Sequence, residues 1–161
     1  MRLRKSVLER ARFVSCVVLL GALSCFASGQ SSAPLSATTI AEADQIQPGE
    51  LAKILTSKAA KPLVFEVGPR MFYQEARIPG AKYAGPGSSA QGIQLLEKTV
   101  SSASKDQFIV LYCGCCPWNR CPNVGPAFAR LRELGYTSVK VLYLANNFGD
   151  DWVRKGYPQE R

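Results

Sequence analysis

The sequence contains no histidine in its 161 residues. Without an imidazole, the chain cannot hold a Ser-His-Asp triad or a Cys-His pair, and it cannot build a metal site that uses a histidine ligand. Hydrolases that depend on such groups are therefore excluded. Whatever nucleophile the chain carries must react without an imidazole base.

The sequence also lacks an apolar run long enough for a comfortable membrane span, which takes about 20 residues. Its longest apolar stretch, residues 13–26, follows five basic residues and precedes small residues at positions 27–29. This order is typical of a secretory signal. We therefore expect residues 1–29 to be a signal peptide and the mature protein to be secreted or periplasmic. Membrane contact is expected only through an uncleaved signal or a lipid anchor, for which residues 22–25 are a loose match.

Runs of lysine and arginine are absent after the signal. The whole chain has 20 basic and 12 acidic residues and a formal net charge of +8. Removal of residues 1–29 takes away five basic residues and one acidic residue, which leaves 15 and 11 and a charge of +4. A modest, dispersed positive charge is more simply a solvated surface than a nucleic-acid site. Because glycine-rich phosphate motifs are also absent, we expect no nucleic-acid partner and no cofactor.

Cysteines are absent from most of the mature chain. Two of the six, Cys16 and Cys25, lie in the predicted signal, and the other four lie within residues 113–121, Cys-Gly-Cys-Cys-Pro-Trp-Asn-Arg-Cys. A disulfide framework would spread cysteines along the chain to close long loops, and these four could close only tiny ones. A thiol near backbone N–H groups at a helix start is favoured as the thiolate. Residues 113–121 are therefore the expected site of chemistry.

The rest of the chain indicates an α/β domain. Residues 30–39 are rich in Ser, Ala, Thr and Pro and are expected to form a flexible tether before one domain at residues 40–161. Apolar runs alternate there with segments of helical apolar spacing, which is typical of a mostly parallel sheet with helices on both faces. Strands are expected at residues 63–67, 108–112 and 139–144, and helices from residue 48, around 93–100, at 124–134 and near 152.

Several of these segments resemble the rhodanese-like family of sulfurtransferases, and the similarity covers roughly residues 46–158. It implies a rhodanese-like three-layer fold with a central, mostly parallel sheet. Each stretch alone is a weak signal, but their order and spacing together are strong. The matching stretches are Leu63–Val67, Arg77–Ala81, Val110–Cys113, Leu131–Tyr136 with Val139, and Trp152 with Gly156–Pro158.

The sequence departs from the family pattern around the expected site. Glu66 and Gly68 replace an aspartate and an arginine of the family, Arg77 replaces a histidine, and asparagines at 146–147 replace a pair of glycines. Glu66 is a candidate to brace either Arg77 or a loop N–H group.

The active-site loop of the family has one cysteine, four residues and then an arginine. Here six residues separate Cys113 from Arg120, whereas Cys115 keeps the spacing of four. We favour Cys113 as the nucleophile, because the end of a strand determines where a thiol emerges, while a loop can lengthen at limited entropic cost.

The resemblance implies a sulfurtransferase that holds sulfane sulfur as a cysteine persulfide. Its partners would be a small anionic sulfur donor and a thiol acceptor. Loop N–H groups and an arginine could bind the donor without any base. The catalytic candidates are Cys113, Arg120 and Cys115, and the substrate-binding candidates are Gly114, Trp118 and Asn119.

Two other functions fit the cysteine loop. Any of Cys115, Cys116 or Cys121 could attack a persulfide or sulfenate on Cys113, which would make the chain a thiol-disulfide redox protein served by a thiol reductase. The four thiolates could instead hold zinc or an iron–sulfur cluster without catalysis. Crowding disfavours a metal, since adjacent cysteines rarely point at one ion.

Overall fold

The computed structural model describes residues 37–161. The predicted signal peptide, residues 1–29, and residues 30–36 of the predicted tether lie outside the described residues. The end of that tether, Ala37–Thr39, forms a short 3-10 helix whose Ala37 is fully buried, so the folded part begins at least three residues before the expected domain start. Within the described residues, no helix is both long and apolar enough to cross a bilayer.

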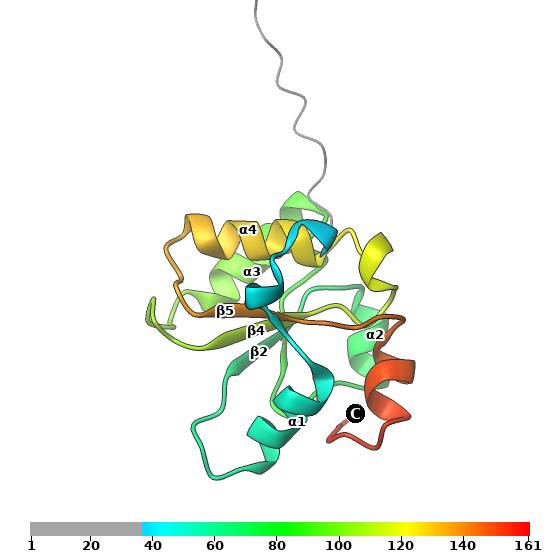
Figure 1. Cartoon of the computed structure of the whole chain (residues 1–161). Helices are drawn as coiled ribbons and strands as arrows, with labels where there is room; N and C mark the ends of the chain where they lie inside the picture. Colours follow the sequence, from blue (N-terminus) through cyan, green and yellow to red (C-terminus); the bar gives the residue numbers. More distant parts are fainter. Residues whose placement is uncertain (1–36) are drawn as a thin grey trace, which may run out of the picture. The chain divides into compact units, whose positions relative to one another are not determined.

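A five-stranded sheet forms the centre of the fold, and all its neighbouring strands run parallel (Figure 1). The strands are β1 (Gln45–Ile46), β2 (Leu63–Glu66), β3 (Lys82–Tyr83), β4 (Ile109–Tyr112) and β5 (Val139–Leu142). Their order across the sheet is β1-β5-β4-β2-β3. The three longer strands confirm the three predicted ones, and the two-residue strands at the edges are too short to produce a recognisable apolar run.

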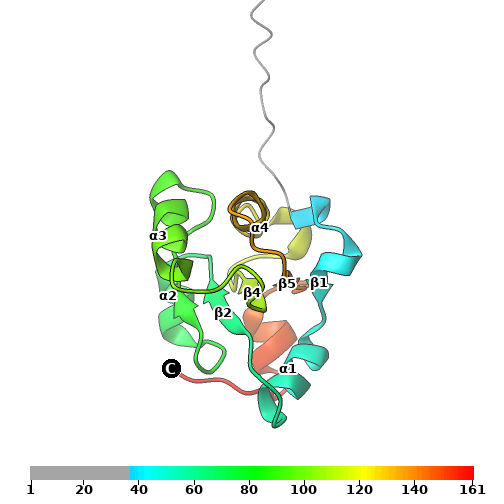
Figure 2. The same cartoon turned by 90° about the vertical axis from the view of Figure 1, so that its left-hand side faces the viewer.

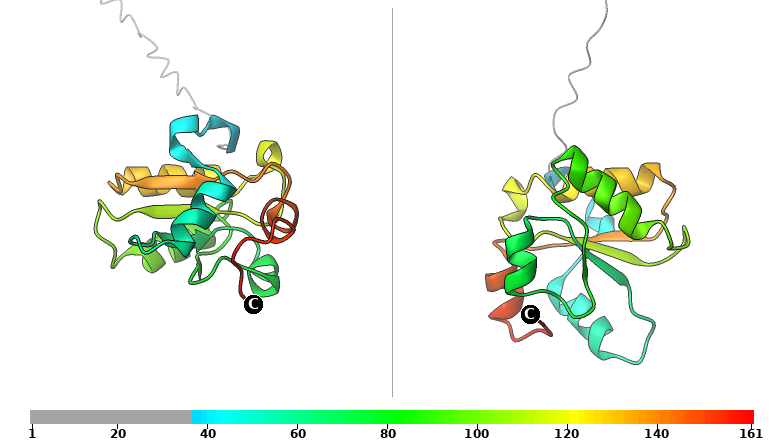
Figure 3. Two further views of the ribbon diagram at one scale, coloured as in Figure 1. Left: turned by 60° about the horizontal axis from the view of Figure 1, so that its bottom comes forward. Right: turned by 180° about the vertical axis from the view of Figure 1, so that it is seen from behind.

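Helices cover both faces of the sheet, which confirms the predicted α/β architecture (Figures 2 and 3). The helical segments are η1 (Ala37–Thr39), η2 (Glu42–Asp44), α1 (Pro48–Thr56), α2 (Arg70–Glu75), α3 (Ala90–Val100), η3 (Trp118–Arg120), α4 (Val124–Glu133) and η4 (Gly149–Val153). α3 and α4 lie on one face, and α1 and η4 lie on the other. The ends follow known preferences: proline begins α1, the Ser89 hydroxyl accepts a hydrogen bond at the start of α3, and Gly135, with a φ of 85°, follows α4.

Strand β4 is buried on both faces, which explains why it is the most apolar run of the domain. Ile109 and Leu111 pack into the core under α3 and α4, while Val110 and Tyr112 pack into the core under α1 and η4. Neighbouring strands on both sides hold β4 in register. This burial determines where the chain leaves the sheet, and Cys113 is the first residue to do so.

Candidate functional site

The cysteine loop, residues 113–121, connects β4 to α4 at the carboxyl edge of the sheet. All four of its cysteines are free thiols. Cys113 and Cys121, at the two ends of the loop, are buried, whereas Cys115 and Cys116 in the middle are half-buried. The loop thus presents two accessible thiols between two that solvent barely reaches.

Three of the thiols are in contact with one another. The sulfur of Cys115 lies 3.4 Å from that of Cys113 and 2.9 Å from that of Cys116. All three sulfur atoms lie within 4.8 Å of one another, and the group does not include Cys121. Cys115 therefore stands between two potential hydrogen-bond donors.

Cys115 is the thiol that these contacts favour as a thiolate. The hydrogen bond with Cys113 lowers the pKa of Cys115, a bond with Cys116 adds to the effect, and together they bring it to about 7 against the opposing effect of burial. The pKa of Cys116 is raised, first by its hydrogen bond with Cys113 and then by burial. Near neutral pH, the Cys116 thiol can donate to a Cys115 thiolate.

The start of α4 acts on a different cysteine from the one expected. Backbone N–H groups of Asn123 and Val124 reach Cys121, but the hydrogen bond with Cys113 and burial outweigh them and raise the pKa of Cys121. The predicted interaction with a helix N-terminus is therefore made by Cys121, which is buried, and not by an accessible thiol. Neighbouring thiols, rather than the helix, favour the thiolate at Cys115.

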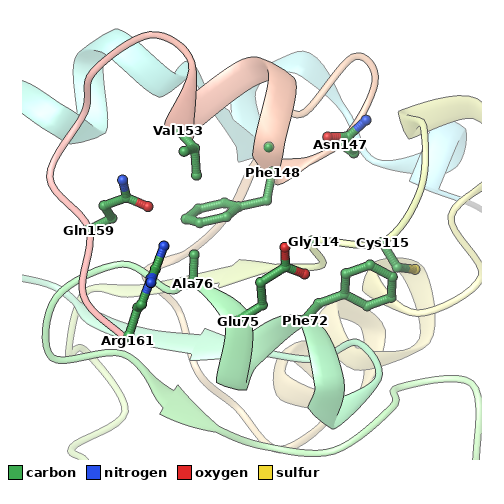
Figure 4. Close-up of a pocket in the computed structure, with 11 residues that line it drawn as sticks. Phe72, Glu75, Ala76, Gly114, Cys115, Asn147, Phe148, Val153, Gln159 and Arg161 are labelled. Atoms are coloured by element: carbon green, nitrogen blue, oxygen red, sulfur yellow. The ribbon is translucent and has the colours of Figure 1, made fainter.

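A cavity of about 400 Å³ opens beside the loop (Figure 4). Cys115 lies at one end of it, next to the ring of Phe72, and Arg161 lies at the other end, beyond the ring of Phe148. Cys113 does not line the cavity, although it is in contact with Cys115. The lining residues are Phe72, Glu75, Ala76, Gly114, Cys115, Asn147, Phe148, Gly149, Val153, Gln159 and Arg161.

Glu66 is a buried carboxyl group that holds the first residues of the loop. It ends β2 and pairs in register with Tyr112 at the end of β4, so its side chain reaches the loop directly. Its Oε1 accepts hydrogen bonds from the backbone N–H groups of Gly114 (3.1 Å) and Gly68 (3.2 Å). Burial raises the pKa of Glu66 to about 8, although these bonds act in the opposite direction. The expected contact with a loop N–H is confirmed, and Arg77 pairs with Glu160 instead.

Asn123 and Gly68 complete the surroundings of Cys113. The Asn123 amide donates to the Cys113 sulfur (3.4 Å), and its oxygen accepts from the N–H of Ser88 (3.2 Å). A Cβ at Gly68 would lie 2.8 Å from the Cys113 sulfur and 2.6 Å from the Glu66 carboxylate. The arginine of the family therefore has no room here. Asn123 was not among the predicted site residues: asparagine just before a helix is typical of a cap, and here its side chain makes no cap hydrogen bond to α4.

Three predicted site residues lie on or beside η3 and do not line the cavity. Asn119 and Arg120 are exposed, and Trp118 packs against Tyr143 with 5.1 Å between ring centroids. Pro117 directly precedes the short 3-10 turn that contains them. Of the predicted substrate-binding residues, Gly114 lines the cavity. Roles for Trp118, Asn119 and Arg120 in binding stay predictions.

The cysteine cluster brings three sulfur atoms within 4.8 Å of one another, whereas structural zinc sites use four ligands. Cys121 is the fourth cysteine of the loop and lies outside that group. Among residues 37–161, Cys113, Cys115 and Cys116 are thus a group that could hold a metal ion, and binding of a metal by all four cysteines stays a prediction.

The family model of the rhodanese-like domain matches residues 47–145, and the chain belongs to this family. No curated protein is similar enough in sequence to match the chain.

Solved structures share the fold. A rhodanese-like domain from Anabaena sp. is 22% identical, with 73% of this chain and 78% of that one covered and a TM-score of 0.54. A Bacillus halodurans protein is 24% identical, with 72% and 75% covered and a TM-score of 0.56. EanB, solved as a cysteine persulfide with ergothioneine, is 22% identical, with 73% of this chain and 28% of that one covered and a TM-score of 0.54.

Proposed function

We propose that the protein is a sulfurtransferase that carries sulfane sulfur as a persulfide on the cysteine loop. The observation that carries this proposal is Cys115: an accessible thiol at the wall of a cavity, in contact with two further thiols, with its pKa lowered to about 7. A thiolate at neutral pH is what sulfur transfer requires, and no imidazole is needed. EanB, which shares this fold over 28% of its chain, has been solved with a cysteine persulfide, which supports the proposal.

In the first step, the Cys115 thiolate attacks the outer sulfur of a donor such as thiosulfate. A sulfur–sulfur bond forms on Cys115 as the donor's own sulfur–sulfur bond breaks, and sulfite leaves with the electron pair. The sequence favours Cys113 for this role, but Cys113 is only 4% exposed and does not line the cavity. Cys115 also keeps the family spacing to Arg120. We therefore propose Cys115 as the attacking thiol.

The test of sulfur transfer uses the full chain. Cleavage after Lys105 and Arg120 by trypsin releases residues 106–120, which contain Cys113, Cys115 and Cys116 and separate them from the other cysteines. Early after anaerobic addition of thiosulfate, this peptide is expected to gain one sulfur atom, and cyanide is expected to remove it as thiocyanate. A peptide that gains no sulfur at any time would reject the proposed function.

We propose a second kind of donor from the position of Arg161 in the cavity wall. Cys115 and Arg161 lie at opposite ends, so a small inorganic anion at Cys115 would leave Arg161 unused, whereas an organic persulfide with a carboxylate could reach both (Figure 4). Arg161 is held there by Arg77, whose guanidinium donates to the Arg161 carbonyl oxygen (2.8 Å).

Replacing Arg161 with alanine is expected to raise the half-saturating concentration of glutathione persulfide about fivefold, since an exposed charge-assisted contact contributes about 1 kcal/mol. Thiosulfate loading should stay unchanged. Arg120→Ala is the matched control, because Arg120 is exposed and does not line the cavity. A larger effect from Arg120→Ala than from Arg161→Ala would restore the assignment made from the sequence.

We further propose, from the sequence, that residues 1–29 direct the protein to a secreted or periplasmic location. In an oxidising compartment, the loop thiols need a reductant to stay free. A thiol reductase is accordingly the partner that we propose beside the sulfur donor and the thiol acceptor.

A further inference from the structure

Cys113 is a buried thiol that lowers the pKa of Cys115 but does not itself attack the donor in the proposed transfer step. At 4% exposure it cannot meet a donor or acceptor in solution, yet its sulfur lies 3.4 Å from that of Cys115. The Asn123 amide holds it from the other side at 3.4 Å. Cys113 is therefore in contact with Cys115, the half-buried cysteine that we propose to carry the persulfide.

We propose that Cys113 resolves the persulfide on Cys115, so that the protein reduces sulfane sulfur to hydrosulfide and ends the cycle with an internal disulfide. This inference rests on the proposed function. The Cys113 sulfur bonds to the Cys115 sulfur, and the bond between Cys115 and the carried sulfur breaks. The carried sulfur leaves with the electron pair and takes the Cys113 proton, which makes it hydrosulfide. The carried sulfur gains two electrons, and the two cysteines together lose two.

The leaving group removes the need for a separate base. A persulfide near neutral pH carries its charge on the outer sulfur, so the same atom that departs can accept the proton of the attacking thiol. This suits a site in a chain without histidine. The reaction also suits a buried nucleophile, because attack occurs on the inner sulfur that Cys113 already touches.

Backbone geometry favours Cys113 over Cys116 as the resolving thiol. Cys116 is in contact with Cys115, at 2.9 Å between sulfur atoms, but the two are adjacent in sequence. Adjacent α-carbons lie about 3.8 Å apart across a trans peptide, below the usual range of about 4.4–6.8 Å for a disulfide. One residue separates Cys113 from Cys115, which relieves this constraint.

An external dithiol must then reset the site. Two thiols of the reductant replace the Cys113–Cys115 bond, become a disulfide themselves and return both cysteines to the reduced state. The proposed thiol reductase has this chemistry. The protein would thus couple a sulfane-sulfur donor to a dithiol partner, with hydrosulfide as the product.

The experiment follows a single turnover of the full chain. The protein is reduced, freed of reductant, loaded with thiosulfate and rapidly desalted, all without oxygen. Samples are quenched by alkylation at intervals. The mass of the tryptic peptide 106–120 is then measured, and the released hydrosulfide is quantified. We expect the peptide first to gain one sulfur atom and then to lose it, ending two hydrogens lighter than the reduced peptide. One hydrosulfide should be released per chain. Cys113→Ser should keep its sulfur at least about tenfold longer, because it loses a thiol of high effective concentration.

Cys116→Ser distinguishes the two neighbours of Cys115, since the loaded variant keeps Cys113 and should still release its sulfur as hydrosulfide. The inference is overturned if the wild-type protein keeps its sulfur as long as Cys113→Ser does, or if Cys116→Ser blocks release. In both cases the sulfur is still gained, so sulfur transfer stands. A peptide that gains no sulfur in any of the three proteins overturns both proposals together.

Discussion

Replacing Cys115 with serine is expected to abolish persulfide formation from thiosulfate, with a loss of roughly a thousandfold or more in the loading rate. A serine hydroxyl has nearly the same size but stays protonated, so it cannot attack the donor without a base, and the chain has no histidine to provide one. The measurement is the rate at which the peptide 106–120 gains sulfur. Thiocyanate formed from thiosulfate and cyanide is a second measure of the same step.

Cys113→Ser is the matched control, because it removes a thiol of the same cluster that does not line the cavity. This variant should still load sulfur. The reverse result, with loading lost in Cys113→Ser and kept in Cys115→Ser, would show that the thiol at the strand end is the nucleophile. It would support the register that the sequence alone favours.

The pH dependence of the loading rate tests the effect of the hydrogen bond between Cys113 and Cys115. Because the thiolate reacts, the wild-type rate should rise with pH and level off above the pKa of Cys115, which is about 7. The hydrogen bond with Cys113 is the largest cause of that lowered pKa. Cys113→Ser should therefore shift the midpoint to higher pH.

The elements around the site could be predicted because their local signals agree. The run 108–112 is apolar throughout since β4 is buried on both faces, and 124–134 has helical apolar spacing since one side of α4 packs on the sheet. The order of strand, loop and helix is then enough to predict that the cysteines lie at the carboxyl edge of the sheet, and no side-chain contact needs to be known.

The arrangement inside the site could not be predicted in the same way. Whether Cys113 or Cys115 faces the cavity depends on the conformation of a nine-residue loop. An irregular loop has no periodic sequence pattern from which its conformation could be predicted. Phe72, Phe148 and Arg161 reach the cavity from segments that lie far apart in sequence. Their meeting depends on the packing of α2 and of the segment after β5, which pattern analysis does not describe.

The free energy of unfolding of the wild-type protein is expected to fall as pH rises, and Glu66→Gln is expected to abolish this fall. The pKa of Glu66 is raised from 4.5 to about 8 by burial. Between these values the native state binds a proton that the unfolded state has released, so stability falls as pH rises and is constant above about 8. Each pKa unit corresponds to about 1.4 kcal/mol, which makes the loss on the order of a few kcal/mol. Glutamine keeps an oxygen for the N–H groups of Gly68 and Gly114 but does not titrate.

The free energy of unfolding in urea, compared between variant and wild type at several pH values, measures this effect. Near pH ~5 the two proteins should be similarly stable, and near pH ~9 Glu66→Gln should be the more stable one. Glu66→Ala is the control, because it leaves the two buried N–H groups without their acceptor and should be less stable than Glu66→Gln at every pH. If the difference between Glu66→Gln and wild type does not change with pH, the carboxyl group is already ionised at low pH in the folded protein. The network that holds Gly114 would then carry a full negative charge beside the cysteines, and the thiolate at Cys115 would form at higher pH than proposed.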